Sequence, residues 1–260
     1  MAATKREREY ARKRQEKWEQ RQAQARARRQ RTFAIVAIVA VLALVGGGLV
    51  VANLGGGANP AASSTQAAGD CPAAEIGARS GGDLPDPSAA EDRTWTATVD
   101  LCAGGTETDL VLELDGAAAP QAVASFVSLA NQGYYDNTSC HRLTTQGIYV
   151  LQCGDPTGTG TGDPGYSYGP IENAPEDDVY PAGTVAMARQ GNNGESMGSQ
   201  FFIVYQDSTI PSDTAGGYTV LGTVTSGLDA VQAVADEGVD GGAGDGSPTT
   251  PVIIEGVETQ

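Results

Sequence analysis

Two stretches in the second half of the chain alternate apolar and polar residues and are bounded by glycine-rich turns. The first reads CHRLTTQGIYVLQCGD over 140–155, and the second reads GSQFFIV over 198–204. A period of two with many β-branched and aromatic residues is typical of β-strands. Strand pairing is therefore the first constraint on how this part of the chain folds.

The same alternation recurs along the rest of this region. Further strands are predicted over 95–101, 109–114, 183–189, 201–205, 218–225 and 252–257. One helix is predicted to begin at Pro120 and to end at Gly133, and a second to cover 228–236. Many short strands with two helices and frequent glycine turns favour a mostly β domain, built as a closed antiparallel barrel, over a parallel α/β sheet.

Charge divides the chain into two unequal parts. Residues 1–31 hold 12 of the 16 Lys and Arg residues and 4 of the 32 acidic residues, which leaves 4 basic and 28 acidic residues and a net charge of −24 for the remainder. The short spacing of Glu and Arg in 1–31 suits a solvated helix with intrahelical ion pairs. We predict a basic cytoplasmic segment that rests on the inner leaflet of a membrane, and we expect no nucleic-acid partner.

An uncharged apolar run covers 32–54. As a helix rising about 1.5 Å per residue it would be roughly 35 Å long, enough to cross a bilayer core of about 30 Å. A cleaved signal peptide is the alternative, but its apolar core is only about 7–15 residues long. With the basic residues on the amino-terminal side, the positive-inside rule predicts a single-pass transmembrane helix whose amino terminus is cytoplasmic.

Residues 55–93 change in composition to Gly, Ala, Ser, Pro and Asp with few apolar side chains. Such a stretch buries too little surface to offset its ordering entropy, so a flexible tether outside the membrane is predicted. The folded domain is predicted over 94–260, where roughly 165 residues suffice for one core.

The supply of reactive side chains limits the chemistry. His141 is the only histidine of the chain. It follows Cys140 on a strand, so the two side chains point to opposite faces and cannot form a Cys–His pair; a packed, hydrogen-bonded histidine is predicted instead. The glycine-rich loop 158–162 lacks the Lys-Ser/Thr of a phosphate-binding loop, and a flexible loop is predicted. The Asp- and Gly-rich stretch 236–245 fails the spacing of a calcium loop, and a solvated turn is predicted.

The motifs HR at 141–142, QCGD at 152–155, MA at 187–188 and GSQFF at 198–202 occur in an order that resembles the cyclophilin-type peptidyl-prolyl cis/trans isomerases, over about 96–257. The resemblance implies an eight-stranded closed barrel with two capping helices, and neither cofactor nor metal. It also implies that Arg142, which by itself could simply pair with an acid, donates a hydrogen bond to the proline nitrogen. Gln152 would orient the substrate and a nearby water.

The resemblance also implies a set of substrate-binding residues. They are Tyr149, Phe202, Val150 and Ile210 in the proline pocket, Tyr218 at its rim, Ala188 and Arg189 along the extended peptide, and Gln200 in the adjacent groove.

Several positions depart from the usual family pattern. Two extra residues lie between Arg142 and Gln152, Tyr149 replaces Phe and Arg189 replaces Asn. Thr209 stands where many members have Trp. These changes predict weak binding of cyclosporin rather than loss of turnover.

The four cysteines all follow the predicted membrane helix, on the side where disulfides persist. Cys140 and Cys153 lie at nearly facing positions on what should be adjacent antiparallel strands, so we predict that they are bridged and that Cys71 pairs with Cys102. Four cysteines allow three pairings, which the sequence does not distinguish. Zinc is a poor alternative because no C-x-x-C spacing occurs and one histidine is present.

Together these features predict a peptidyl-prolyl isomerase of the cell membrane, with its catalytic domain outside, in an envelope of Gram-positive, actinobacterial type. Its partners would be proline-containing peptides and unfolded exported proteins, whose folding it would assist. The alternative is a proline-peptide-binding chaperone or scaffold with little turnover. Retention of both Arg142 and Gln152 favours the enzyme, because a pure binder would need only the pocket.

Overall fold

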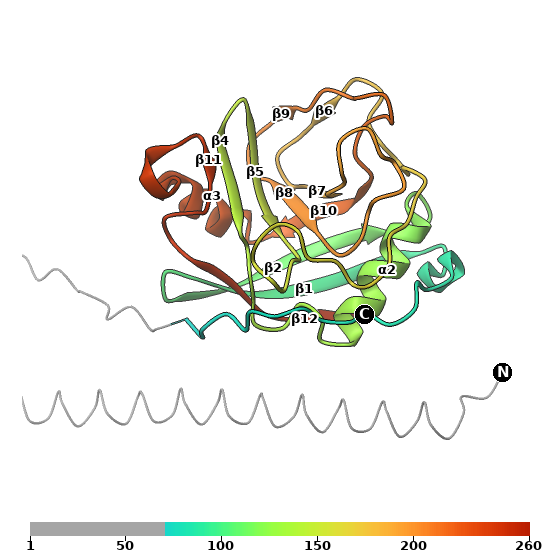
Figure 1. Cartoon of the computed structure of the whole chain (residues 1–260), viewed down its shortest axis with the longest axis horizontal. Coiled ribbons are helices and arrows are strands. Elements are labelled where there is room, and N and C mark those ends of the chain that lie inside the picture. The colour runs from blue at the N-terminus through green and yellow to red at the C-terminus, as the bar shows by residue number, and fades with distance from the viewer. Residues whose placement is uncertain (1–70) are drawn as a thin grey trace, which may run out of the picture. The chain divides into compact units, whose positions relative to one another are not determined.

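The computed structural model describes residues 71–260 (Figure 1). The predicted basic segment 1–31, the predicted membrane helix 32–54 and the first part of the predicted tether, 55–70, lie outside the described residues. Within 71–260, no helix combines the length and the apolar character needed to cross a membrane.

The described residues form short strands with two α-helices between them. The strands are β1 (Thr94–Ala103), β2 (Thr106–Asp115), β3 (Thr138–Ser139), β4 (Arg142–Gln146), β5 (Ile148–Cys153), β6 (Val179–Tyr180), β7 (Thr184–Met187), β8 (Phe201–Val204), β9 (Ser208–Thr209), β10 (Val220–Ser226), β11 (Asp245–Gly246) and β12 (Val252–Thr259). The helices are α2 (Pro120–Asn131) and α3 (Leu228–Glu237), with 3-10 turns η1 (Pro87–Ala90) and η2 (Asp240–Gly242). Both predicted helices are confirmed.

Ten of the strands form one curled antiparallel sheet, in the order β11-β4-β5-β8-β7-β10-β2-β1-β12-β3, while β6 and β9 pair separately (Figure 1). The mostly β, antiparallel prediction is confirmed, but the closed eight-stranded barrel is wrong, because this order has two ends. The reason lies at Cys140 and His141, which belong to no strand. They divide one stretch of chain into β3, which pairs with β12, and β4, which pairs with β5.

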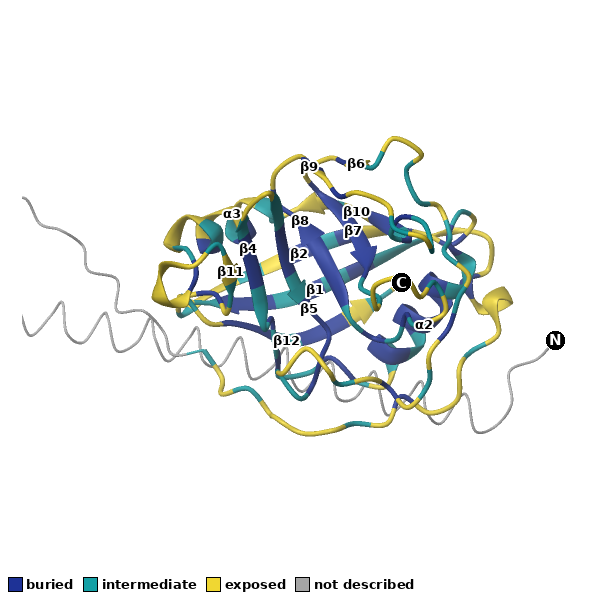
Figure 2. Cartoon of the chain, turned by 45° about the horizontal axis from the view of Figure 1, so that its top comes forward, coloured by how far each residue is buried: buried dark blue, intermediate teal, exposed yellow. Residues whose placement is uncertain are grey.

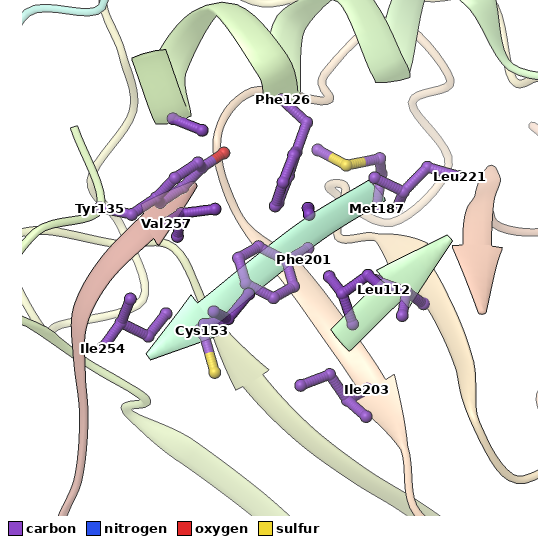
Figure 3. Close-up of a cluster of buried hydrophobic side chains, with 14 of the residues drawn as sticks. Leu112, Phe126, Tyr135, Cys153, Met187, Phe201, Ile203, Leu221, Ile254 and Val257 are labelled. Atoms are coloured by element: carbon purple, nitrogen blue, oxygen red, sulfur yellow. The ribbon is translucent and has the colours of Figure 1, made fainter. Parts of the chain in front are cut away.

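The main hydrophobic core lies between one face of the sheet and α2 (Figures 2 and 3). Phe126 of α2 meets Phe201 of β8 edge to face, with ring centroids 5.4 Å apart, and Tyr135 meets the same ring at 5.8 Å. Burying a side chain of this size contributes about 1.5–3 kcal/mol. The inward-facing half of each strand is therefore committed to packing, which leaves the outward-facing half for a site.

Residues 71–93 are not the flexible tether that their composition predicts. Arg79 Nη1 donates to the carbonyl oxygens of Tyr134 and Asp136, at 2.9 and 2.6 Å. The amide of Gly81 donates to the carbonyl of Pro164 at 2.7 Å. These backbone acceptors lie far along the chain, so composition alone gives no sign of them. The segment is a strap bonded along the domain.

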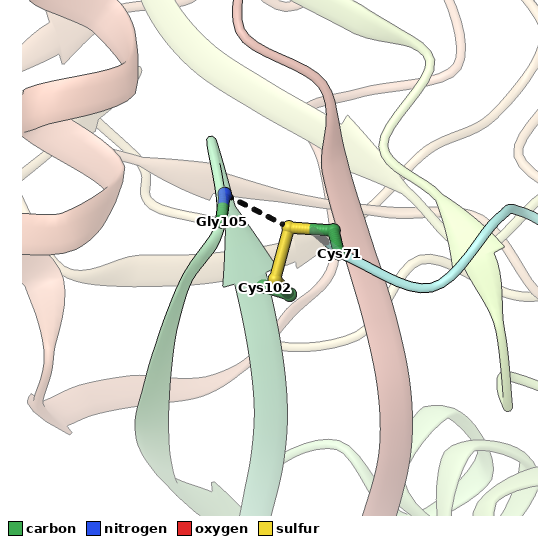
Figure 4. Close-up of a disulfide and its surroundings, with 3 residues drawn as sticks. All are labelled: Cys71, Cys102 and Gly105. Carbon is green, nitrogen blue, oxygen red and sulfur yellow. Dashed lines mark hydrogen bonds between the residues drawn. A yellow bond between two sulfur atoms is a disulfide. The ribbon is translucent and has the colours of Figure 1, made fainter. Parts of the chain in front are cut away.

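Two disulfides are present in the described residues, and both have the predicted pairing. Cys71 is bonded to Cys102 with a Cα–Cα distance of 5.6 Å, which fastens the beginning of the strap to β1 (Figure 4). Cys140 is bonded to Cys153 with a Cα–Cα distance of 4.0 Å. This second bond joins the residues just before β4 to the end of β5.

Candidate active site

A second apolar cluster lies on the face of β5, β7 and β8 that points away from the main core. Side chains alternate along each strand, so Phe201 and Ile203 of β8 belong to the main core while Phe202 and Val204 belong to the second cluster. The buried members of the second cluster are Val150, Tyr180, Ala186, Phe202, Val204 and Ile210. Partly buried Ile148, Ala188, Tyr218 and Val220 pack against it.

Three of the predicted site residues form a row across adjacent strands beside this cluster. Arg142 of β4 pairs in register with Gln152 of β5, and Gln152 pairs with Phe202 of β8. Directly opposed residues of antiparallel strands project to the same face. The guanidinium, the amide and the ring therefore lie side by side, and Arg142 Nη1 donates to Gln152 Oε1 at 3.3 Å. The structure brings the predicted catalytic pair together with the predicted pocket residues Val150, Phe202 and Ile210.

Asp245 of β11 holds the other side of the Arg142 guanidinium. Arg142 Nε donates to Asp245 Oδ1 and Nη2 donates to Oδ2, both at 2.7 Å. The hydrogen bonds with Asp245 raise the pKa of Arg142, and the same bonds lower the pKa of the Asp245 carboxyl. Arg142 is therefore cationic at any ordinary pH. Three of its five N–H donors have partners among the described residues, and two do not.

The Gln152 amide is oriented by a second glutamine. Gln152 Nε2 donates to Gln200 Oε1 at 2.8 Å, and Gln200 Nε2 donates to the carbonyl of Gly162 at 2.9 Å. This chain of amides fixes which end of Gln152 faces Arg142, namely the oxygen. The predicted groove residue Gln200 thus acts on the site through Gln152.

The loop that carries Gly162 is fastened to a buried carboxylate. Asp155 accepts hydrogen bonds from the amides of Thr157, Thr159, Gly160 and Gly162, at 2.7–3.1 Å. Burial raises the pKa of Asp155, but these bonds and one from the Thr157 hydroxyl outweigh burial, and its pKa is lowered. The prediction of a flexible loop over 158–162 is wrong, because three of its five amides, those of Thr159, Gly160 and Gly162, donate to one carboxylate.

Tyr149 does not line the pocket as predicted. It precedes Val150 on β5 and therefore faces the other side of the sheet, where it packs against the main core. Its ring lies 6.0 Å from that of Tyr205, centroid to centroid. The position next to it, Ile148, projects toward the pocket cluster instead. The sequence signal for this was available, since Ile148, Val150 and Gln152 share one phase of the alternation.

Tyr218, predicted at the rim of the proline pocket, packs against the second apolar cluster as a partly buried residue. Its ring meets that of Phe202 edge to face, with centroids 5.5 Å apart and an interplanar angle of 82°. The guanidinium carbon of Arg189 lies 4.6 Å from the centre of the Tyr218 ring. Arg189 thus braces the rim from behind.

The Arg189 side chain is only 1% exposed and is fully occupied by the domain itself. Its nitrogens donate to Asp213 and to the carbonyls of Gln190, Gly216 and Gly217. The amide of Ala188 likewise donates to the carbonyl of Gln200, at 2.9 Å. Neither group is free to pair with an extended peptide, so the predicted peptide contacts at these two residues are limited to their remaining backbone atoms.

His141 is packed as predicted, but the predicted hydrogen bond is absent. Both ring nitrogens are buried and have no hydrogen-bond partner among the described residues. Burial lowers the pKa of the imidazole, so the ring is neutral at physiological pH. Asp245, by contrast, is a site residue that sequence reasoning missed, because no motif distinguishes it among 28 acidic residues.

A curled antiparallel sheet with two helices, and an arginine and a glutamine beside an outward-facing apolar cluster, define a cyclophilin-like protein. The chain belongs to the family described as cyclophilin-type peptidyl-prolyl cis-trans isomerase/CLD, whose family profile matches residues 98–259. That match covers more than half of the chain.

Curated relatives agree with this assignment. The probable peptidyl-prolyl cis-trans isomerase B of Mycobacterium leprae is 42% identical over 181 residues, which cover 65% of this chain and 59% of the relative. Peptidyl-prolyl cis-trans isomerase B of Bacillus subtilis is 43% identical over 117 residues, which cover 45% of this chain and 76% of the relative. The chain thus spans about three fifths of the length of the mycobacterial relative.

Solved structures share the fold. A crystal structure of a cyclophilin-type isomerase from Cryptosporidium parvum superposes with a TM-score of 0.53 at 27% identity, covering 65% of this chain and 98% of that one. A structure of the same protein in the presence of the dipeptide Ala-Pro gives a TM-score of 0.52 at 28% identity, covering 64% of this chain and 98% of that one.

Proposed function

We propose that the domain catalyses cis/trans isomerisation of Xaa-Pro peptide bonds. The observation that carries this proposal is the row Arg142–Gln152–Phe202, in which a permanently charged donor stands next to a buried apolar ring. The apolar cluster suits a proline ring, and the donor suits the proline nitrogen. The dipeptide Ala-Pro in the related structure from Cryptosporidium parvum is consistent with a site for proline peptides.

The chemistry needs no proton transfer and no covalent intermediate. Rotation about a peptide bond is opposed by its partial double-bond character, with a barrier of about 18–20 kcal/mol. As the bond twists, the proline nitrogen becomes pyramidal and gains a lone pair. A donor that bonds this lone pair stabilises the twisted state more than either planar state, which lowers the barrier.

Arg142 is suited to that role because its guanidinium is held in place and still keeps N–H donors to offer. Asp245 and Gln152 occupy three of its donors, and two remain without a partner among the described residues. Gln152, oriented by Gln200, would in turn position the carbonyl before the proline or a bridging water. Phe202, Val150, Ile148 and Ile210 would hold the proline ring, with Tyr218 at the rim.

The test is turnover of a short Xaa-Pro peptide by the full-length chain, measured by exchange NMR, beside Arg142→Ala. We expect wild-type catalysis, and a loss of at least about tenfold in kcat/KM for the variant, because removal of one transition-state donor has an effect of that order or larger. Circular dichroism of both proteins shows whether the variant is folded. If neither protein accelerates exchange while proline peptides still bind, the domain is a binding module and the enzyme proposal fails.

We further propose that the domain is held outside the cell membrane by the segment 32–54 and assists folding of exported proteins. Support comes from the basic residues of 1–31, the apolar run after them, and two disulfides in the described domain, since disulfides persist in oxidising compartments. Protease treatment of intact spheroplasts tests the orientation. Digestion of residues 71–260 with survival of 1–31 is expected, and protection of the domain would overturn the proposal.

Cyclosporin is proposed to bind only weakly. Thr209, which replaces the Trp of many family members, is an exposed residue of the two-residue strand β9 and offers little apolar surface. Inhibition of peptide turnover at increasing cyclosporin concentration is the measurement. Tight, stoichiometric inhibition would contradict this proposal and leave the isomerase proposal intact.

A further inference from the structure

The Asp- and Gly-rich stretch after α3 ends at Asp245, whose carboxylate binds the Arg142 guanidinium from strand β11. We propose that Asp245 is the positioning residue of this site: its carboxylate fixes the plane of the Arg142 guanidinium so that the unpaired N–H donors face the proline pocket. The inference is tested by two experiments. The kinetic experiment rests on the proposed function, and the spectroscopic experiment rests on the geometry alone.

The backbone places Asp245 on the correct face. Strand β11 pairs with β4 so that Asp245 lies opposite Thr144, two residues from Arg142 along the same strand. Opposed residues, and residues two apart on a strand, project to one face. Asp245 and Arg142 are therefore diagonal neighbours on the pocket side, at a separation that a long arginine side chain can bridge.

The approach of β11 to β4 is close and is supported on both sides. Gly244 accepts a hydrogen bond from the amide of Thr145 at 2.9 Å, and a Cβ added to Gly244 would lie 2.7–3.0 Å from the Gln146 side chain. A Cβ added to Gly246 would lie 2.9 Å from Val239 Cγ1. Glycine on both sides of Asp245 thus lets a carboxylate come within reach of the arginine. This gives a physical role to a stretch that the sequence predicted to be only a solvated turn.

The geometry of the ion pair determines which donors stay unpaired. Asp245 takes the Nε–H and one Nη2–H of Arg142, which together form one edge of the planar guanidinium. Gln152 takes one Nη1–H. Both partners restrain the guanidinium plane, and one Nη1–H and one Nη2–H remain without a partner among the described residues. Without Asp245, the 3.3 Å hydrogen bond to Gln152 is the one other side-chain bond among residues 71–260 that would restrain the guanidinium.

Replacing Asp245 should change the position of Arg142 with little change in the folding stability of the domain. The Arg142 and Asp245 side chains are 41% and 54% exposed, and ion pairs of such exposure add little to folding stability. The chain offers a matched control in Arg93 and Glu91, an ion pair whose side chains are 41% and 59% exposed and which lies outside the pocket. If substitution of Asp245 lowers turnover and substitution of Glu91 does not, the cause is the position of the Arg142 guanidinium rather than the loss of one negative charge from the domain.

The kinetic experiment compares full-length wild type with Asp245→Ala, Asp245→Glu and Glu91→Ala. We expect Asp245→Ala to lose about tenfold in kcat with KM unchanged, because a misplaced group weakens the transition state and not the pocket. Asp245→Glu should recover part of that loss, since a longer carboxylate on an exposed edge strand still reaches Arg142. Glu91→Ala should match wild type. Equal or faster turnover by Asp245→Ala would overturn the inference.

The spectroscopic experiment needs no activity. The Nε–Hε signal of Arg142, assigned by its loss in Arg142→Lys, should show slow solvent exchange in wild type and fast exchange in Asp245→Ala, while Glu91→Ala leaves it unchanged. If wild type does not turn over peptides, the proposed function fails and this experiment still decides whether Asp245 fixes Arg142. An Arg142 signal that is indifferent to Asp245→Ala would overturn the positioning role even in an active enzyme.

Discussion

Arg142 and Arg189 each bind an aspartate through two hydrogen bonds, yet the two arginines are built for different purposes. Arg189 is 1% exposed, and all of its N–H donors are bonded to Asp213 or to backbone carbonyls. Arg142 is 41% exposed and keeps two donors without a partner among the described residues. A saturated, buried guanidinium can only hold structure together, whereas an anchored and unsaturated one can act on a ligand.

The difference follows from where each arginine sits in the sheet. Arg142 belongs to β4 next to the edge strand β11, so solvent and ligands reach one side of it. Arg189 follows β7 in the middle of the sheet and turns under the loop that contains Asp213, where it braces Tyr218. One residue type thus serves as the proposed donor on one side of the pocket and as a clamp on the other.

The largest expected difference between Arg189 and Arg142 is in their contribution to the folding stability of the domain. Arg189→Ala should lower the free energy of unfolding by about 3–5 kcal/mol, because it leaves backbone carbonyls and a carboxylate without their buried partner. Urea unfolding of the full-length chain measures this. Arg93→Ala, which removes an exposed arginine that pairs with Glu91 and stacks on Trp95, is the control and should cost only about 1 kcal/mol. Similar midpoints for both variants would show that Arg189 is not a clamp.

The disulfides give the next largest effect. Cys140→Ser with Cys153→Ser should lower the unfolding free energy by about 3 kcal/mol, and Cys71→Ser with Cys102→Ser by about 4 kcal/mol, since the unfolded loops have sequence separations of 13 and 31. Cys140 lies two residues before Arg142 and Cys153 directly follows Gln152, whereas Cys71 and Cys102 lie away from both. Only the loss of the Cys140–Cys153 bond should therefore also lower kcat. A fall in kcat for both double variants would show that turnover depends on the stability of the whole domain rather than on the Cys140–Cys153 bond beside the site.

Much of this arrangement could be predicted from the sequence, and the failures are instructive. The family resemblance implied the site residues Arg142, Gln152 and Phe202, and Pro120 and Gly133 marked the ends of the first helix. Alternation predicted the longer strands, because side-chain direction in a strand has a period of two. The same rule, applied to Tyr149, would have replaced it with Ile148. The error arose where a family position was carried over without testing it against strand phase.

Other features could not be predicted, because they join segments that are far apart in sequence. Asp245 meets Arg142 across 103 residues, and Arg189 meets Asp213 across 24. The strap over 71–93 is held by backbone carbonyls, which every residue possesses, so no residue type marks its partners. The open order of the sheet depends on the break at Cys140 and His141, where local alternation predicts a continuous strand.

Arg142→Lys gives a smaller but more selective effect. A lysine keeps the charge and has no planar fork, so it cannot bind Asp245 at two points and also donate toward the pocket. We expect kcat/KM to fall by about tenfold with the unfolding free energy within about 0.5 kcal/mol of wild type. Arg189→Lys should show the reverse, with stability reduced more than turnover. Equivalent losses from the two substitutions would remove the distinction between donor and clamp.

The smallest effect is on the acid titration of the two aspartates. The hydrogen bond from Arg189, with those from the Asn192 and Ala215 amides, holds the pKa of Asp213 far below its usual range, and Arg142 lowers the pKa of Asp245. A carboxyl whose pKa is lowered by folding contributes stability above its unfolded pKa of about 3.9, and that contribution is lost as the pH falls toward the folded value.

Carboxyl carbon NMR of the full-length chain between roughly pH 6 and pH 2 should therefore show Asp245 titrating below the usual range, while Asp213 stays largely ionised down to the lowest pH measured. Arg142→Ala should return Asp245 to the usual range and leave Asp213 unchanged, because the two ion pairs share no residue. If Asp245 titrates normally in wild type, its carboxylate does not hold Arg142 in solution. Arg142 would then differ from Arg189 in two ways, since it would be more exposed and would also lack a firmly bound aspartate.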